Sequence, residues 1–389
     1  SFFETNVNFL KGNIGAGFLS LPFAFAHAGY AGSIIYLLLI ALIAVHCMHM
    51  LVKVKQHLAD QGSTGYLSYA DVRTIGRYGI YLVNFALLIT QFGFCLVYIL
   101  FIADHLNELD PAPLSLVLGL SFGLPTPLAS SISVPAYALI VLPGAILLTW
   151  IRDFRTIAPT SIVATLCLIF SFIVIFGVYA IPPILYISLR CFVSQLPIFF
   201  GNSIFAFESI GLVLPMENSM AEPERFATVI NIGMSVVVIL YVSFGALGYM
   251  VFGDAVQGSI TLNLPDTPIF DSVKIALCIA LFQSIAIQFF PAINVLERAY
   301  MPVVERNVRS RLQTPVQLGI RSIIMCICAG LAIGIPKLGL VISLIGSLGA
   351  ALLALIFPPL MHMRTFWHEM GPVVKSKDIF ITFFGVVGM

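Results

Sequence analysis

The stretch Lys11-Gly12-Asn13-Ile14-Gly15-Ala16-Gly17-Phe18-Leu19-Ser20-Leu21-Pro22 places three glycines within six residues of an otherwise apolar segment. Because hydrocarbon offers no water to backbone groups, a segment that crosses a membrane is expected to be helical. Glycine is a poor residue for a helix interior and lets the backbone open, which exposes amide N–H and C=O groups. The stretch therefore predicts an interrupted first span. A simple packing face is the alternative, because Gly12, Ala16 and Ser20 also recur every four residues.

The rest of the sequence has the composition of a membrane protein. Of the 389 residues, 59% are hydrophobic and 10% are charged, and the mean hydropathy is +1.03. These values lie far outside the range of soluble domains. The apolar runs are too long for barrel strands, so the predicted class is all-α. A net charge of +1 without a long Lys/Arg block excludes a basic nucleic-acid binder.

Apolar runs separated by polar breaks predict ten complete spans, and a partial eleventh that is expected to be truncated. Together they form a single transmembrane domain over residues 1–389. The spans lie at about 7–28, 31–52, 79–103, 134–151, 157–180, 195–216, 227–252, 272–297, 316–335 and 339–361, with the partial one at 378–389.

The distribution of Lys and Arg predicts the orientation of these spans. With the N-terminus in the cytoplasm, fifteen basic residues of the loops and span ends fall on the cytoplasmic side. Only Arg190, Lys274 and Lys337 fall outside. Cytoplasmic loops carry an excess of Lys and Arg, so the N-terminus is expected to be cytoplasmic.

The sixth span contains a second irregular stretch, Gly201-Asn202-Ser203-Ile204-Phe205-Ala206-Phe207-Glu208-Ser209-Ile210-Gly211. Glu208 places a carboxyl group deep in the membrane, which is costly and by default indicates function. The structural alternative is a carboxylate that binds loosened backbone. Both irregular stretches contain Gly-Asn, and each reaches a phenylalanine, Phe18 or Phe207, five residues after the asparagine.

Because the two irregular spans are five apart, they predict an inverted repeat of five plus five helices. Repeat one covers about 7–180 and repeat two about 195–361, and the eleventh helix follows at about 378–389. Free N–H groups and helix N-termini in such breaks bind a carboxylate, whereas unwound carbonyls and helix C-termini bind an ammonium. A zwitterionic α-amino acid carries both groups and fits this backbone chemistry.

Other polar residues indicate less. His46 and His49 lie on one helix face, but no third ligand accompanies them, so no metal site is predicted. No nucleophile elbow, Walker loop or zinc-hydrolase spacing is present, so the sequence does not predict an enzyme. The cysteines lie almost wholly in apolar runs, where they behave as small hydrophobic residues.

Several short motifs occur in order from the first span to the tenth: LKGNIG at 10–15, FAFESIG at 205–211, LPMEN at 214–218, FG at 252–253, QGSITLNLP at 257–265, LVISLIGS at 340–347 and PP at 358–359. In order and spacing they resemble the proton-coupled amino acid transporters of solute carrier family 36, within the amino acid/auxin permease group.

The resemblance implies eleven helices in a LeuT-like fold that carries small neutral amino acids such as glycine, alanine or proline, with a proton as the coupling ion and no other cofactor. It implies a carboxylate site in the first span, an ammonium site and gate in the sixth, and Gln91 and Tyr98 as side-chain contributors. The implied site residues are Gly12, Asn13, Ile14, Gly15, Ala16, Gly17, Tyr98, Phe205, Ala206, Phe207, Glu208 and Ser209.

Two departures from the family pattern affect these expectations. Relatives commonly have a histidine where this chain has Asn8, which cannot ionise, so Glu208 is the best remaining proton carrier. They also commonly have a cysteine in each long exoplasmic segment, and 104–133 and 253–271 contain none. A uniporter, or an amino-acid sensor that signals through a cytoplasmic partner, remains an alternative function. The expected location is the plasma membrane or an endolysosomal membrane.

Overall fold

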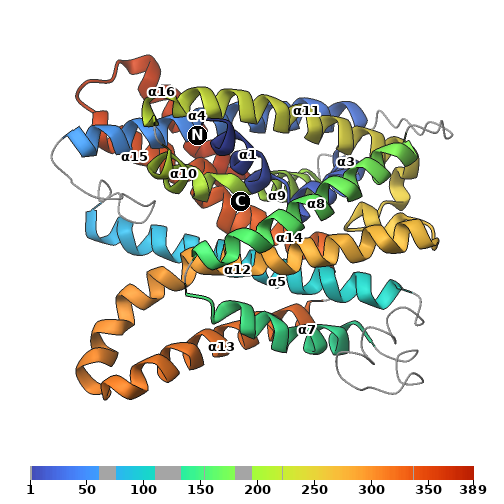
Figure 1. Ribbon diagram of the computed structural model, residues 1–389. Coiled ribbons are helices and arrows are strands. Elements are labelled where there is room, and N and C mark those ends of the chain that lie inside the picture. The colour runs from blue at the N-terminus through green and yellow to red at the C-terminus, as the bar shows by residue number, and fades with distance from the viewer. Residues whose placement is uncertain are drawn as a thin grey trace. The chain divides into compact units, whose positions relative to one another are not determined.

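The computed structural model describes residues 2–60, 76–109, 133–152, 154–179, 195–220, 222–335 and 337–389. Within these ranges every regular element is a helix (Figure 1). Seven helical segments there are long and apolar enough to cross a membrane, and Val134–Thr149 and Val163–Gly177 are shorter apolar helices. The predicted all-α membrane class is therefore confirmed.

Helices occupy most of the described part of every predicted span. The long α-helices are α4 (Tyr30–Asp60), α5 (Gly76–Glu108), α7 (Val134–Thr149), α8 (Phe154–Tyr179), α11 (Phe226–Phe252), α12 (Pro268–Asn307), α13 (Ser310–Gly334) and α16 (Pro372–Gly388). The first span comprises α1 (Phe2–Asn13), α2 (Ala16–Leu19) and α3 (Leu21–Ala28). The sixth comprises α9 (Leu196–Ala206), the 3₁₀ segment η5 (Glu208–Leu212) and α10 (Val213–Ser219). The tenth comprises α14 (Leu338–Ile345), the π segments η9 (Gly346–Ala350) and η10 (Leu352–Ile356), and α15 (Phe357–Phe366).

Short 3₁₀ segments connect some of these helices. They are η6 (Pro223–Arg225), η7 (Gly253–Ala255) and η8 (Ile260–Asn263). Several helices extend beyond the apolar runs that predicted them, and α12 is 40 residues long where the sequence predicted 272–297. Polar residues end an apolar run, but a helix can continue beyond the hydrocarbon, because its backbone hydrogen bonds are internal to the segment.

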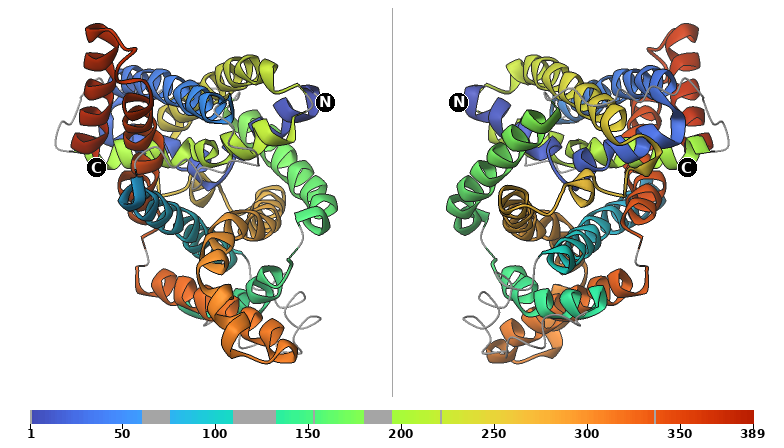
Figure 2. Two further views of the ribbon diagram at one scale, coloured as in Figure 1. Left: turned by 90° about the vertical axis from the view of Figure 1, so that its left-hand side faces the viewer. Right: turned by 90° about the vertical axis from the view of Figure 1, so that its right-hand side faces the viewer.

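The chain divides into two compact units. Unit 1 contains Ser1–Thr90, Ile184–Ser259 and Ile342–Met389, and unit 2 contains Gln91–Pro183 and Ile260–Val341. In unit 1, α11 packs along α1, α3 and α4, and α15 packs against α4 and α16 (Figures 1 and 2). In unit 2, α12 packs against α7, α8 and α13, and α13 also packs against α7.

Close backbone contact holds the sixth and tenth spans together inside unit 1. A Cβ atom on Gly346 would lie 1.9 Å from the carbonyl oxygen of Gly201, and one on Gly201 would lie 2.2 Å from the carbonyl oxygen of Ser343. The Ser343 hydroxyl donates to the Ile198 carbonyl at 3.3 Å. Small residues at helix contacts permit this approach, which replaces the hydrophobic driving force that lipid does not supply.

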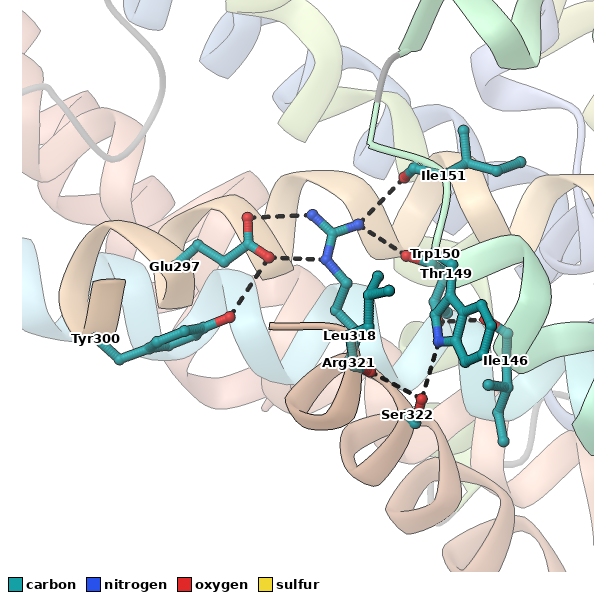
Figure 3. A network of polar contacts seen from close by, with 9 residues as sticks. All are labelled: Ile146, Thr149, Trp150, Ile151, Glu297, Tyr300, Leu318, Arg321 and Ser322. Carbon is teal, nitrogen blue, oxygen red and sulfur yellow. Dashed lines mark hydrogen bonds and ion pairs between the residues drawn. The ribbon is translucent and has the colours of Figure 1, made fainter. Parts of the chain in front are cut away.

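Unit 2 is organised by a buried arginine (Figure 3). Arg321 of α13 is 2% exposed. Its Nε and Nη2 donate to the two carboxylate oxygens of Glu297 on α12, at 2.7 and 3.1 Å. Its Nη1 donates to the carbonyls of Thr149 and Ile151 at 2.7 and 3.1 Å. One guanidinium thus joins α12 and α13 and binds carbonyls at the C-terminal end of α7, which that helix leaves unpaired.

Candidate functional site

The first span is interrupted at the predicted place. Helix α1 ends at Asn13, Ile14 and Gly15 are not helical, and α2 lasts only four residues before Ser20. Gly15 is extended, with φ −143° and ψ −158°. The Ser20 hydroxyl donates to the Gly17 carbonyl at 2.8 Å, which satisfies an acceptor in this irregular segment.

The sixth span is interrupted in the same manner. Helix α9 ends at Ala206, and Phe207 leaves the helical region with φ −82° and ψ 50° before η5 begins. Glu208 is the first residue of η5. The side chains of Glu208 and Ser209 lie outside what the structure describes, so only their backbone is placed.

Unit 1 brings these two interruptions into contact. A Cβ atom on Gly17 would lie 2.7 Å from the Cα atom of Ala206 and 2.8 Å from Cδ1 of Phe205. Gly17 belongs to α2, which packs on α9. The glycine stretch is therefore broken and also closely packed, and the close contact is at Gly17, which is not part of the Gly12, Ala16 and Ser20 pattern.

Tyr241 of α11 joins the two broken spans. Its ring is fully buried, and its hydroxyl contacts the carbonyl oxygens of Asn13 and Ala206, the latter at 2.5 Å. Asn13 is the last residue of α1 and Ala206 the last of α9. Both oxygens lie at helix C-termini, where carbonyls lack intrahelical partners and carry the negative end of the helix dipole.

Aromatic rings surround this contact. The Phe18 ring lies 5.6 Å from the Tyr241 ring and stacks on Phe244 at 4.1 Å, measured between centroids. The Phe207 ring lies 5.1 Å from that of Tyr241. Phe18 and Phe207, the two phenylalanines that occupy matching positions in the sequence, thus contact the same tyrosine, and all four side chains are buried. The arrangement can present carbonyl oxygens to a cation within apolar walls.

The family sequence model described as "Transmembrane amino acid transporter protein" matches residues 1–389. The chain belongs to this family. The transporter is 29% identical over 385 residues to the proton-coupled amino acid transporter-like protein pathetic of Drosophila melanogaster, covering 94% of this chain and 77% of that protein. It is 28% identical over 404 residues to amino acid transporter AVT3B of Arabidopsis thaliana, covering 100% of this chain and 91% of that protein.

Family membership confirms the resemblance that the motifs indicated. The chain is an amino acid transporter of the membrane, and not an enzyme. The family match spans both interrupted helices and Tyr241.

The predicted site residues of the transporter belong to both units. The stretch from Gly12 to Gly17 and that from Phe205 to Ser209 belong to unit 1, whereas Gln91 and Tyr98 belong to unit 2. Gln91 and Tyr98 both lie on α5, and their side chains are buried, at 2% and 1% exposed. The structure thus brings together the first-span and sixth-span residues within one unit.

The two asparagines of the irregular stretches have equivalent roles in the transporter. The Asn13 amide donates to the Phe9 carbonyl at 2.9 Å, and the Asn202 amide donates to the Ile198 carbonyl at 2.9 Å. Each thus bonds the carbonyl four residues before it, and it is the backbone of Asn13 that contacts Tyr241. The side chain of Asn8, the position of the family histidine, lies outside the described part.

Tyr241 was not predicted from the transporter's sequence, and the local signal for it is a hydroxyl in the middle of an apolar span. His49 forms a 2.8 Å hydrogen bond with Asn231 of α11, and this agrees with the interpretation of the His46/His49 pair as hydrogen-bonding residues and not metal ligands. Over the residues that the structure describes, no group of three His, Cys, Asp or Glu residues could hold a metal ion.

Proposed function

We propose that this transporter carries small neutral amino acids in symport with a proton, by alternating access at a site between its interrupted first and sixth spans. One observation carries the proposal: Gly17 packs on Ala206, and Tyr241 contacts the carbonyls that end α1 and α9. These contacts unite two breaks that are remote in sequence. A substrate ammonium matches the carbonyl ends, and a substrate carboxylate matches the amide groups of the Gly15–Gly17 stretch.

The chemistry of the surroundings supports a small and neutral substrate. The groups around the breaks are backbone carbonyls, a glycine and the rings of Phe18, Phe207 and Tyr241. Apart from the Glu208 carboxyl group, which we assign to the proton, an ionised substrate side chain would find no charged partner among these groups. The site is therefore expected to accept glycine, alanine or proline and to reject lysine and glutamate.

A LeuT-like inverted repeat is supported by which helices belong to each unit. Unit 1 contains the first, second, sixth and seventh spans and most of the tenth, and unit 2 contains about half of the third together with the fourth, fifth, eighth and ninth. Four pairs of spans that are five apart thus share a unit, whereas the fifth and tenth spans lie in different units. The matching asparagine bonds of Asn13 and Asn202 add to this support.

Glu208 is the proposed proton carrier. A carboxyl group removed from water favours its neutral form, whereas a neighbouring ammonium favours the carboxylate. Proton occupancy of a carboxyl group at the break then depends on substrate occupancy, and this dependence couples the two fluxes. The name of the Drosophila relative, a proton-coupled amino acid transporter-like protein, supports proton coupling but does not bear on the residue that carries the proton.

The test is uptake of labelled glycine, alanine and proline into proteoliposomes with an imposed pH difference. The wild-type protein should accumulate substrate above equilibrium, and Glu208→Gln should only equilibrate it. Glu222→Gln is the matched control, because Glu222 is exposed and pairs with Arg225 three residues away. Unlabelled alanine should compete, and lysine and glutamate should not.

Each contrary outcome has a defined meaning. Accumulation that persists in Glu208→Gln excludes Glu208 as the carrier. Equilibration without accumulation in the wild type leaves a uniporter, and binding without flux leaves a sensor. Competition by lysine or glutamate as strong as that by alanine contradicts the neutral substrate class.

A further inference from the structure

The contact of Tyr241 with two carbonyl oxygens has an unequal number of donors and acceptors. A phenolic hydroxyl carries a single proton, so it donates to the carbonyl of Asn13 or to that of Ala206, but not to both at once. Two acceptors at the negative ends of α1 and α9 therefore share the single proton of this hydroxyl. A primary ammonium has three N–H donors and a positive charge, and a secondary ammonium has two, so either serves both acceptors better.

We propose that the Tyr241 hydroxyl occupies the place of the substrate ammonium when the transporter is empty, and that the amine displaces it on binding. The proposal rests on the proposed function in one respect, namely that substrate binds at these breaks. Tyr241 is then a positioning residue that sets the affinity for amines and holds the empty site together.

The packing of the Tyr241 ring fits this role. Phe18 from the first break and Phe207 from the second both contact the ring, and α11 itself supplies Phe244 behind Phe18. The tyrosine thus touches both broken spans through its ring as well as through its hydroxyl. With the hydroxyl bound, the two helix ends stay together without any ligand, because the donor comes from the protein itself.

This role predicts different effects on two modes of transport. In net uptake the carrier must return empty, and the empty carrier depends on the Tyr241 contact. In equilibrium exchange the carrier returns loaded, and the substrate ammonium supplies the donor. Loss of the hydroxyl should therefore slow net uptake but spare exchange. It should also tighten substrate binding, because a competitor for the same carbonyls is gone.

The experiment compares Tyr241→Phe with the wild type in proteoliposomes, using labelled alanine. Net uptake into empty vesicles should fall about tenfold, while exchange into alanine-loaded vesicles stays within about twofold of wild type. The exchange KM and the Kd from equilibrium binding should both fall by about fivefold, the equivalent of one neutral hydrogen bond.

Tyr249→Phe is the matched control. Tyr249 is also fully buried on α11, but its hydroxyl donates to Asp254 at 3.2 Å. It should leave the ratio of exchange to net uptake unchanged. Tyr241→Met removes the same hydroxyl with a different side-chain shape and should reproduce the effect of Tyr241→Phe, which separates loss of the hydroxyl from a packing defect.

Several results would overturn the proposal. A parallel loss of exchange and net uptake would make Tyr241 a general structural residue, and unchanged kinetics would make its hydroxyl irrelevant. Weaker alanine binding in both variants would show that the hydroxyl assists the ammonium instead of competing with it. Failure of the proposed function is distinguishable, because it would appear in the wild-type protein as an absence of alanine binding and exchange.

Discussion

Gly17 lies too close to Ala206 for any side chain beyond hydrogen. The distance of 2.7 Å from an added Cβ to a backbone Cα atom leaves no flexible group to move aside. The two broken spans would have to separate, and the contacts of Tyr241 with both helix ends would separate with them. Gly177 of α8 is the opposite case, with nothing within 4 Å of an added Cβ.

We expect Gly17→Ala to reduce transport by about tenfold or more, since overpacking costs about 1–3 kcal/mol. Gly177→Ala should transport normally, and because alanine favours a helix over glycine by about 0.5–1 kcal/mol, it should be equally or more stable. Initial rates of alanine uptake per folded protein, with folding checked by size-exclusion chromatography, measure the difference. Normal uptake by Gly17→Ala would show that the two breaks need not touch during transport.

At the scale of elements, a buried ion pair joins helices of unit 2. Arg321 satisfies carbonyls at the end of α7 and both oxygens of Glu297, which is 13% exposed. The planar guanidinium suits this bidentate arrangement, and an ammonium does not. By contrast, Arg225 and Glu222 form a pair three residues apart, with side chains 68% and 61% exposed.

Arg321→Met should destabilise the protein by about 3–5 kcal/mol, because it leaves Glu297 buried without its cation. Arg321→Lys should restore only part of this loss. Arg225→Met should cost at most about 1 kcal/mol, as is usual for exposed pairs. Thermal unfolding of the three variants in detergent provides the comparison, and a shift for Arg225→Met as large as that for Arg321→Met would contradict it.

At the scale of the whole molecule, the distribution of basic residues predicts the orientation in the membrane. Fifteen Lys and Arg residues are expected on the cytoplasmic side and three outside. Two exposed positions are expected on opposite sides of the membrane. Ser310 begins α13 at an expected cytoplasmic turn, and Asp266 lies in the expected exoplasmic segment before α12.

Cysteines introduced at these two positions should react differently with a membrane-impermeant maleimide. In intact cells with the protein at the surface, Asp266→Cys should be labelled at once, and Ser310→Cys only after permeabilisation. The parent protein is the control for background from its own cysteines, among which Cys326 is exposed. Labelling of Ser310→Cys in intact cells, with Asp266→Cys protected, would reverse the predicted orientation.

Local sequence by itself determined the membrane class, the positions of the helices and the break in the first span. Each of these depends on properties that act within one segment, namely hydropathy and the backbone freedom of glycine. The family motifs indicated amino acid transport.

Only the tertiary structure decided that Gly17 meets Ala206, that Tyr241 joins Asn13 to Ala206, and that Arg321 binds Glu297 and the end of α7. Tyr241 and Asn13 are 228 residues apart. A lipid-facing side and a helix-facing side can be equally apolar, so hydropathy does not show which faces meet, and packing between distant segments selects the partners.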